Sequence, residues 1–158
     1  PKIKDLEKAN IEVHYLGYYL KWTPQEVYYY AVENTGFKAR PFRSQGTFSK
    51  YSSIDDKIDD LHFYTTFIKF GIGRATYDAS QEIRNNHIMR EEGVALVRKF
   101  DGEFPDKYFY DIMDYLEIDR EYFKSDLTDC FRSPHLWGKD EEGIWKLRHN
   151  VFRGGIDD

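Results

Sequence analysis

A row of polar residues in the first half of the sequence has the spacing of one helical face. We call it the polar seam, and it consists of Asp55, Asp59, His62, Thr66, Lys69 and Gly73. Steps of three or four residues place side chains on the same face of an α-helix. A lysine or histidine among apolar residues is costly unless it meets a charge, which a bound phosphate or carboxylate can supply. The polar seam is therefore either a wall of an anion-binding pocket or a solvated stripe on an otherwise buried helix.

The stretch FGIGR at residues 70–74 follows the polar seam directly. Gly71 and Gly73 remove side chains where a ligand or a backbone segment can approach. The guanidinium of Arg74 can bind a phosphate or carboxylate through two parallel hydrogen bonds. The alternative is that Arg74 pairs with Asp78, four residues later, and that the glycines only end a helix. The sequence contains no G-x-x-x-x-G-K-[ST] loop, which excludes a P-loop NTPase site.

Other reactive residue types give weaker signals. Histidines occur at positions 14, 62, 87, 135 and 149, without H-x-x-x-H or H-E-x-x-H spacing, and we predict no metal site. The single cysteine, Cys130, excludes an internal disulfide and a multi-cysteine zinc site. Its spacing from Phe123, Leu127 and Phe131 places it on an apolar helical face, so we predict that Cys130 is a small core residue.

The elements that position these residues are predicted to be mainly α-helical. Lys2 to Lys8 resembles the end of a charged helix, and the alternation from Ile11 to Leu16 predicts one half-buried strand. Thr23 and Pro24 begin a helix that Gly36 ends. One strand cannot form a sheet, so we expect its neighbours to be missing or to lie in another chain. Residues 37–53 are predicted to form a long ordered loop.

Five further helices are predicted from caps and apolar spacing. The helix that carries the polar seam begins with Ser52 or Ser53 as its cap and ends near Gly71 or Gly73. Helices at 75–85 and 90–100 follow. Pro105 begins a helix with an apolar face, and Asp119 caps the last one. Residues 133–158 are predicted to be an extended or partly disordered tail, with a short helix or strand within residues 144–151.

Composition narrows the class of protein. The chain has 158 residues, about one domain, with 41% hydrophobic and 32% charged residues, so it is predicted to be globular. A net charge of −5 argues against binding to nucleic acid, which needs a basic face. No run of about 18 apolar residues and no signal peptide are visible, so we expect a cytoplasmic protein without membrane insertion. The 13 Tyr, 12 Phe and 3 Trp are either buried around polar groups or await another protein.

Several long blocks of the sequence occur in the order of a known family. They are LGYYLKWTPQE (16–26), GTFSKYSSIDDKID (46–59), FIKFGIGRATYDASQEIR (67–84), REEGVALVRKFDGEFP (90–105) and FRSPHLW (131–137). Together they resemble the C-terminal half of the N-acetyl sugar amidotransferase family of bacterial lipopolysaccharide O-antigen and flagellin sugar biosynthesis. Met89 departs from the pattern, since the family usually has a threonine helix cap there. We therefore expect the helix at 90–100 to have a weaker start.

The resemblance implies the helical C-terminal portion of an α/β enzyme of the PP-loop, or ATP-pyrophosphatase, type. It implies that residues 1–22 end the nucleotide-binding domain, that residues 23–132 form the helical domain, and that 133–158 are a tail. The Ser-Gly-Gly-x-Asp-Ser loop for ATP is absent from this sequence. Because the chain begins at Pro1 rather than at methionine, we expect it to be a piece of a longer protein. Alone it should be inactive.

The implied chemistry is amidine formation. With magnesium, ATP adenylates the oxygen of an N-acetyl group on a nucleotide-linked sugar, and ammonia from a glutaminase and a barrel-type partner subunit then displaces AMP. Side-chain chemistry and the seam geometry add the substrate-binding prediction, which names Lys50, Lys57, Lys69 and Arg74 as cations for phosphate charge and His62 and Asp78 as orienting groups. No catalytic residue is assigned. The alternative is a noncatalytic docking or dimerisation module that uses the aromatic residues at interfaces. Such interfaces could also join copies of this chain in a homo-oligomer.

Overall fold

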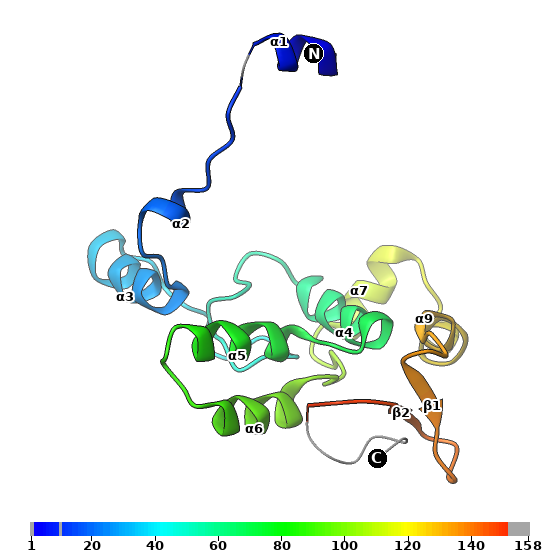
Figure 1. Cartoon of the computed structure of the whole chain (residues 1–158). Helices are drawn as coiled ribbons and strands as arrows, with labels where there is room; N and C mark the ends of the chain where they lie inside the picture. The colour runs from blue at the N-terminus through cyan, green and yellow to red at the C-terminus, as the bar shows by residue number, and fades with distance from the viewer. Residues whose placement is uncertain (1, 10, 152–158) are drawn as a thin grey trace. The chain divides into compact units, whose positions relative to one another are not determined.

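The computed structural model describes residues 2–9 and 11–151, and it divides the chain into two compact units. The first unit, Pro1–Lys38, contains helices α1 (Ile3–Lys8), α2 (Leu16–Tyr19) and α3 (Pro24–Thr35). The second unit, Ala39–Asp158, contains the remaining elements. The mainly α-helical fold class is confirmed (Figure 1). The domain boundaries predicted at residues 22 and 132 stay predictions.

Helix α3 has the ends that its sequence predicts. The N–H of Glu26 donates to Oγ1 of Thr23 at 3.3 Å, and the Thr23 hydroxyl donates to Glu26 Oε2 at 2.6 Å. Pro24 is the first helical residue. Gly36 ends the helix with φ 71°, a left-handed conformation that favours glycine.

The strand predicted at Ile11–Leu16 is wrong. Residues 11–15 belong to no helix or strand, and Leu16 already begins α2. The alternating side chains remain in water, since Val13 and Tyr15 are each 81% exposed. Among the described residues, no other strand lies beside this segment, and backbone groups in a strand need a neighbour for their hydrogen bonds. Alternation without a partner therefore does not give a strand here.

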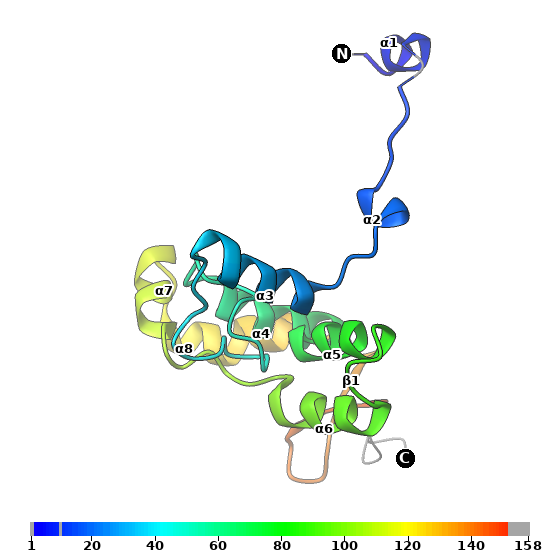
Figure 2. The ribbon, with the colours of Figure 1, turned by 90° about the vertical axis from the view of Figure 1, so that its left-hand side faces the viewer.

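The second unit begins with a loop and then folds into a set of short helices. They are α4 (Asp59–Phe70), α5 (Arg74–Arg84), α6 (Arg90–Phe100), α7 (Phe109–Leu116), α8 (Arg120–Tyr122), the π-helix η1 (Phe123–Leu127) and α9 (Thr128–Phe131). Helix α4 contacts both α5 and α9. Helices α5 and α6 form a hairpin around a turn at Asn85 and Asn86, and Figures 1 and 2 show them side by side. No helix among the described residues is long and apolar enough to cross a bilayer.

A two-stranded antiparallel sheet completes the second unit. Strand β1 (Trp137–Lys139) pairs with β2 (Trp145–Leu147) in the register Trp137 to Leu147. Strand β2 confirms the short element predicted within residues 144–151. Residues 152–158 of the predicted tail lie outside the described residues. The buried ring of Trp137 meets Phe67 of α4 edge-on, with ring centroids 5.4 Å apart, and so anchors the sheet to the helices.

Two starts predicted for helices are wrong. Helix α4 begins at Asp59, not after Ser52 or Ser53, because local side chains hold the preceding residues in turns. Asp56 accepts the N–H of Ile58 at 2.8 Å, and Ser53 donates to the Asp59 carboxylate. Helix α7 begins at Phe109, since residues 106–108 form a turn after Pro105. Because α4 begins only at Asp59, Asp55 lies outside this helix, and the polar seam is shorter than predicted.

The prediction that Cys130 is a core residue is also wrong, because Cys130 is exposed. Phe123 is 2% exposed and faces the core from η1. A π-helix takes more residues per turn than an α-helix, so it rotates the residues that follow it. On a regular α-helix, Cys130 would lie on the same face as Phe123. Because π-helical residues lie between them, Cys130 faces solvent instead.

The core of the second unit forms where α4, α7 and η1 meet. Its buried members are Leu61, Phe109, Ile112, Met113 and Phe123. Between α5 and α6 the packing is closer. A side chain at Gly93 would meet the Cδ1 atom of Ile83 at 2.7 Å, so glycine lets the two helices approach. At the start of α6, Glu92 accepts the N–H of Met89 at 2.7 Å and supplies one half of a capping box.

Candidate functional site

An ion pair fixes the loop before α4 to the segment after α6. The guanidinium of Arg43 donates to both carboxylate oxygens of Glu103, with both distances 2.5 Å. The N–H of Gly46 donates to the same carboxylate at 2.9 Å. Burial by itself would raise the pKa of Glu103, but these hydrogen bonds outweigh it and the net pKa lies below its usual range. The hydrogen bond to Glu103 in turn raises the pKa of Arg43.

Asp78 joins the same loop to α5. Its carboxylate accepts hydrogen bonds from Thr47 Oγ1 at 2.5 Å and from Arg74 Nε at 2.8 Å, with Ser52 Oγ at 3.4 Å. The guanidinium carbon of Arg74 also lies 5.2 Å from the ring centre of Phe63. Arg74 and Asp78 thus form the i,i+4 pair that was the structural alternative for them. Most of the charge of this arginine is neutralised inside the chain.

Asp101 caps helix α5 from the end of α6. Its carboxylate accepts the N–H of Gly73 at 3.1 Å, the N–H of Thr76 at 3.2 Å and the Thr76 hydroxyl. Burial raises the pKa of Asp101 although these hydrogen bonds oppose it. Gly73 is required by this approach, because a Cβ there would lie 2.5 Å from Asp101 Oδ1. What the glycine of FGIGR makes room for is therefore a carboxylate of the chain itself.

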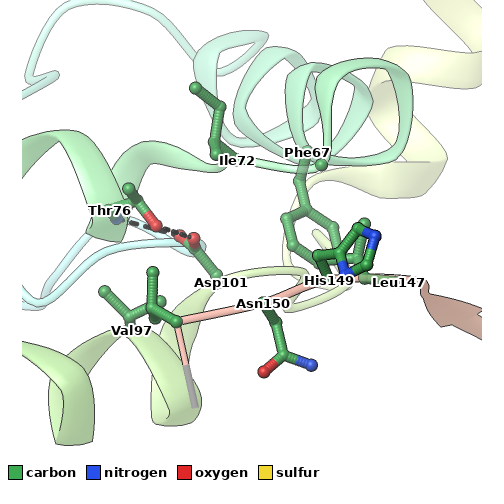
Figure 3. A pocket seen from close by; sticks show the side chains of 10 residues that line it. Phe67, Ile72, Thr76, Val97, Asp101, Leu147, His149 and Asn150 are labelled. Carbon is green, nitrogen blue, oxygen red and sulfur yellow. Dashed lines mark hydrogen bonds between the residues drawn. The ribbon is translucent and has the colours of Figure 1, made fainter. Parts of the chain in front are cut away.

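A cavity of about 270 Å³ lies beside this cap (Figure 3). It is lined by Phe67, Gly71, Ile72, Thr76, Val97, Asp101, Leu147, His149, Asn150 and Val151. Figure 3 shows the ring of Phe67 reaching into it from α4, with Thr76 and Asp101 bonded to each other on the opposite wall. Since these two polar groups already satisfy each other, the cavity is suited to an apolar group. None of the six predicted substrate-binding residues lines it.

A second hollow of about 350 Å³ uses another face of α4 as its wall. We call it the α4–η1 groove, and its lining residues are Leu61, His62, Thr65, Thr66, Lys69, Phe70, Leu116, Ile118, Phe123, Leu127 and Phe131. His62, Thr66 and Lys69 of the polar seam are all among them. The opposite wall is apolar and comes mainly from η1 and α9.

The six predicted residues do not form one site. Arg74 and Asp78 pair within the hydrogen-bond network that joins the loop before α4 to α5, whereas His62 and Lys69 line the α4–η1 groove. Lys57 lies apart and pairs with Asp111, with Nζ 3.0 Å from Oδ2, at a shallow surface hollow. Lys50 is exposed. Their role as substrate ligands stays a prediction.

Several polar contacts were not predicted from the sequence. Arg43 and Glu103 are 60 residues apart, and no periodicity links them. Asp60 is buried with Arg40 Nη1 3.7 Å from its Oδ1, and burial raises the pKa of Asp60 although Arg40 opposes the shift. One signal was available for Asp101: a carboxylate that follows a helix end and precedes a glycine is a common turn residue. Among the described residues, no group of three or more His, Cys, Asp or Glu side chains is placed to hold a metal ion.

The fold and these contacts define a mainly helical domain in which Asp78 and Glu103 bind the surface loop and helix α4 borders two hollows. Residues 45–151 match the family model described as LPS biosynthesis protein WbpG-like, C-terminal domain, and the chain belongs to this family. The match includes every residue of both hollows. No curated protein matches the chain significantly. The family assigns the chain to lipopolysaccharide biosynthesis.

Proposed function

We propose that this chain is the C-terminal part of an ATP-dependent N-acetyl sugar amidotransferase. The enzyme would convert an acetamido group of a nucleotide-linked sugar into an acetamidino group during the synthesis of bacterial surface polysaccharide. Membership of a lipopolysaccharide-biosynthesis family over residues 45–151 supports the setting. The sequence blocks that resemble amidotransferases support the reaction.

The observation that carries the proposal is that three of these blocks meet in one network. Thr47 of the block at 46–59 bonds to Asp78 of the block at 67–84. Glu103 of the block at 90–105 accepts the N–H of Gly46, and Asp101 of the same block caps the helix that begins after Gly73. The resemblance therefore concerns residues that touch one another, which is the pattern of a shared folded unit rather than of scattered similarity.

The described residues do not fit a site for ATP and magnesium. The carboxylates of Asp78, Asp101 and Glu103 already accept hydrogen bonds from protein donors, and the sequence has no phosphate-binding loop of the kinds named above. ATP and magnesium are therefore proposed to bind to a part of the protein outside these residues. We propose that this chain completes the substrate site. Its hydrogen-bond network would keep the residues of that site in a fixed position.

Product analysis tests the proposal. The longer protein that contains this chain is incubated with ATP, magnesium, ammonia and a nucleotide-linked diacetamido sugar, and the sugar is followed by mass spectrometry. We expect ATP-dependent replacement of one amide oxygen by NH, with release of pyrophosphate and of AMP that carries this oxygen, and no turnover by the 158-residue chain alone. If the longer protein leaves the sugar unchanged under these conditions, or if the isolated chain turns it over, the proposal is wrong.

A docking role is the second candidate, and the first unit favours it. Tyr15, Tyr18, Tyr19 and Trp22 are between 58% and 85% exposed. Aromatic side chains of this kind are enriched in interface cores. The partners would be the ammonia-supplying glutaminase and barrel-type subunits, or a second copy of the chain.

A double substitution separates the two functions. Tyr18→Ser with Trp22→Ser should lower partner binding in a pull-down with purified subunits, while turnover with free ammonia stays at the wild-type rate. Loss of turnover with free ammonia would instead place these side chains in the catalytic unit and would contradict the docking role.

A further inference from the structure

We propose that the α4–η1 groove is a binding site for an organic phosphate, in which α4 holds the phosphate and the π-helical wall packs against a planar or apolar group. The evidence for this binding site is the lining of the groove and the contacts of its residues. Only the choice of a nucleotide as the probe rests on the proposed function.

The helix side of the groove presents polar side chains that have no hydrogen-bond partner among the residues described by the structure. His62, Thr66 and Lys69 follow one another at i, i+4 and i+7 and line the groove together. Within the described residues, their side chains make no hydrogen bond or ion pair; the contacts are His62 with the Phe63 ring and Lys69 with the Phe70 ring. Imidazole, hydroxyl and ammonium groups all donate to phosphate oxygens.

The charge of the groove is one-sided. Among its described lining residues, His62 and Lys69 are the ionisable ones, and no carboxylate is present. Two other cations of the second unit have an acidic partner, since Arg43 pairs with Glu103 and Lys57 pairs with Asp111. In a chain with a net charge of −5, a groove with basic residues and no acidic ones attracts an anion locally.

The opposite wall is apolar and irregular. Phe123 and Leu127 reach the groove from η1, and Phe131 follows from α9. A π-helical turn is rare and is found frequently at functional sites, because it re-aims side chains at a cost in stability. Here Leu127 and the core residue Phe123 both line the groove, whereas Cys130 does not and is exposed. The volume of about 350 Å³ suits a small ligand, and the wall suits its organic part.

The test uses nuclear magnetic resonance on the 158-residue chain, without ATP or partners. Uridine 5′-diphosphate is the probe, inorganic pyrophosphate supplies the charge without the organic part, and uridine supplies the organic part without the charge. We expect uridine 5′-diphosphate to shift the amide signals of residues 62–70 and 123–131 and to bind at least about tenfold more tightly than either comparison ligand. Higher ionic strength should weaken this binding.

Substitutions locate the phosphate. Lys69→Ala should weaken the binding of uridine 5′-diphosphate by about tenfold, the effect of losing one hydrogen bond to a charged group, and Lys69→Arg should retain most of it. Lys99→Ala is the matched control, because Lys99 is an exposed residue in the last turn of α6, outside the groove, and contacts the ring that follows it as Lys69 does. All three side-chain changes are on exposed residues, so unchanged circular dichroism spectra and melting points should accompany them.

Four results would overturn the inference. Equal affinity for pyrophosphate and for uridine 5′-diphosphate would show that the π-helical wall does not bind the organic part of the ligand. Binding unaffected by Lys69→Ala, or shifts confined to the cavity beside Asp101, would place the site elsewhere. Groove signals that move with chain concentration and not with ligand would identify the occupant as a second copy. None of these results depends on turnover, so they remain distinct from failure of the amidotransferase proposal.

Discussion

Gly73 lies where even a methyl group would collide with the half-buried carboxylate of Asp101. Its φ of −109° is open to any residue, so the constraint is space and not backbone strain. A Cβ would lie 2.5 Å from Asp101 Oδ1 and 2.8 Å from its Cγ. Asp101 cannot retreat without losing its hydrogen bonds to the start of α5. We predict that Gly73→Ala lowers the free energy of unfolding by about 1–3 kcal/mol, measured by urea denaturation.

Gly93→Ala is the matched comparison in the same unit. Its Cβ would meet the terminal methyl of Ile83, which can rotate, and alanine favours the helix by about 0.5–1 kcal/mol over glycine. The two effects oppose each other, so Gly93→Ala should cost less than Gly73→Ala. The reverse order would show that Asp101 is not held as tightly as its contacts indicate.

Glu103 should make the stability of the second unit depend on pH. Its pKa is lowered in the folded chain, so folding favours the charged form. The resulting stabilisation is fully present above the ordinary pKa of glutamate, about 4.3, and is lost as the pH falls through the folded value. We predict that Glu103→Gln costs about 1–3 kcal/mol at pH 7, because it weakens the contacts to Arg43 and Gly46.

The difference between wild type and Glu103→Gln should shrink as the pH is lowered from 7 towards 3, because the wild-type carboxylate then begins to take up a proton. Urea denaturation at both pH values measures it. The exposed Glu142 offers a control, since Glu142→Gln should change stability little at either pH. A cost for Glu103→Gln that is equal at both pH values would mean that the negative charge of Glu103 does not contribute to the free energy of unfolding.

At the scale of elements, α3 depends on its own ends. None of its residues is buried, so packing contributes little and local hydrogen bonds matter more. We predict that Thr23→Ala destabilises α3 by about 0.5–2 kcal/mol, and that Thr23→Ser keeps the cap. Amide hydrogen exchange of residues 27–35 measures this directly. Equal exchange in the alanine and serine variants would argue against capping by Thr23.

Elements defined by neighbouring residues were predictable from the sequence. Thr23 with Pro24 and Gly36 bound α3, and Gly71 ends α4 in a left-handed conformation. The strand at residues 11–16 was not predictable in the same way, because a strand depends on a partner that periodicity cannot supply. The start of α4 failed because Ser53 bonds to the carboxylate of Asp59 and not to the backbone of a helix that follows it.

The candidate site was predictable only where it follows one helix. His62, Thr66 and Lys69 share a face of α4 as their spacing indicates, and Arg74 with Asp78 is visible as an i,i+4 pair. The contacts between distant segments follow from tertiary packing, and the spacing of residues in a single sequence contains no signal for them. The π-helical turn also escaped, because apolar spacing assumes 3.6 residues per turn throughout.

At the scale of the whole molecule, the two units differ in how they are stabilised. Every described residue from 2 to 22 is exposed, whereas the buried hydrophobic residues lie between Leu61 and Trp137. The family match also begins only at residue 45. Hydrophobic stabilisation of the chain therefore comes from its second unit, and the first unit presents apolar side chains that remain in water.

Removal of residues 1–22 should consequently leave the second unit intact. We predict a shift in its melting temperature of less than about 4 °C, roughly the effect of 1 kcal/mol in a domain of this size. The shortened chain should also self-associate less in sedimentation velocity, because it lacks exposed residues such as Val13, Tyr18 and Trp22. Substitution of Tyr18 and Trp22 by serine in the whole chain separates loss of apolar surface from loss of chain length, since it should reproduce the effect on association. A large drop in melting temperature after truncation would show that the first unit stabilises the second, and residues 1–22 would then have to be counted as part of its fold.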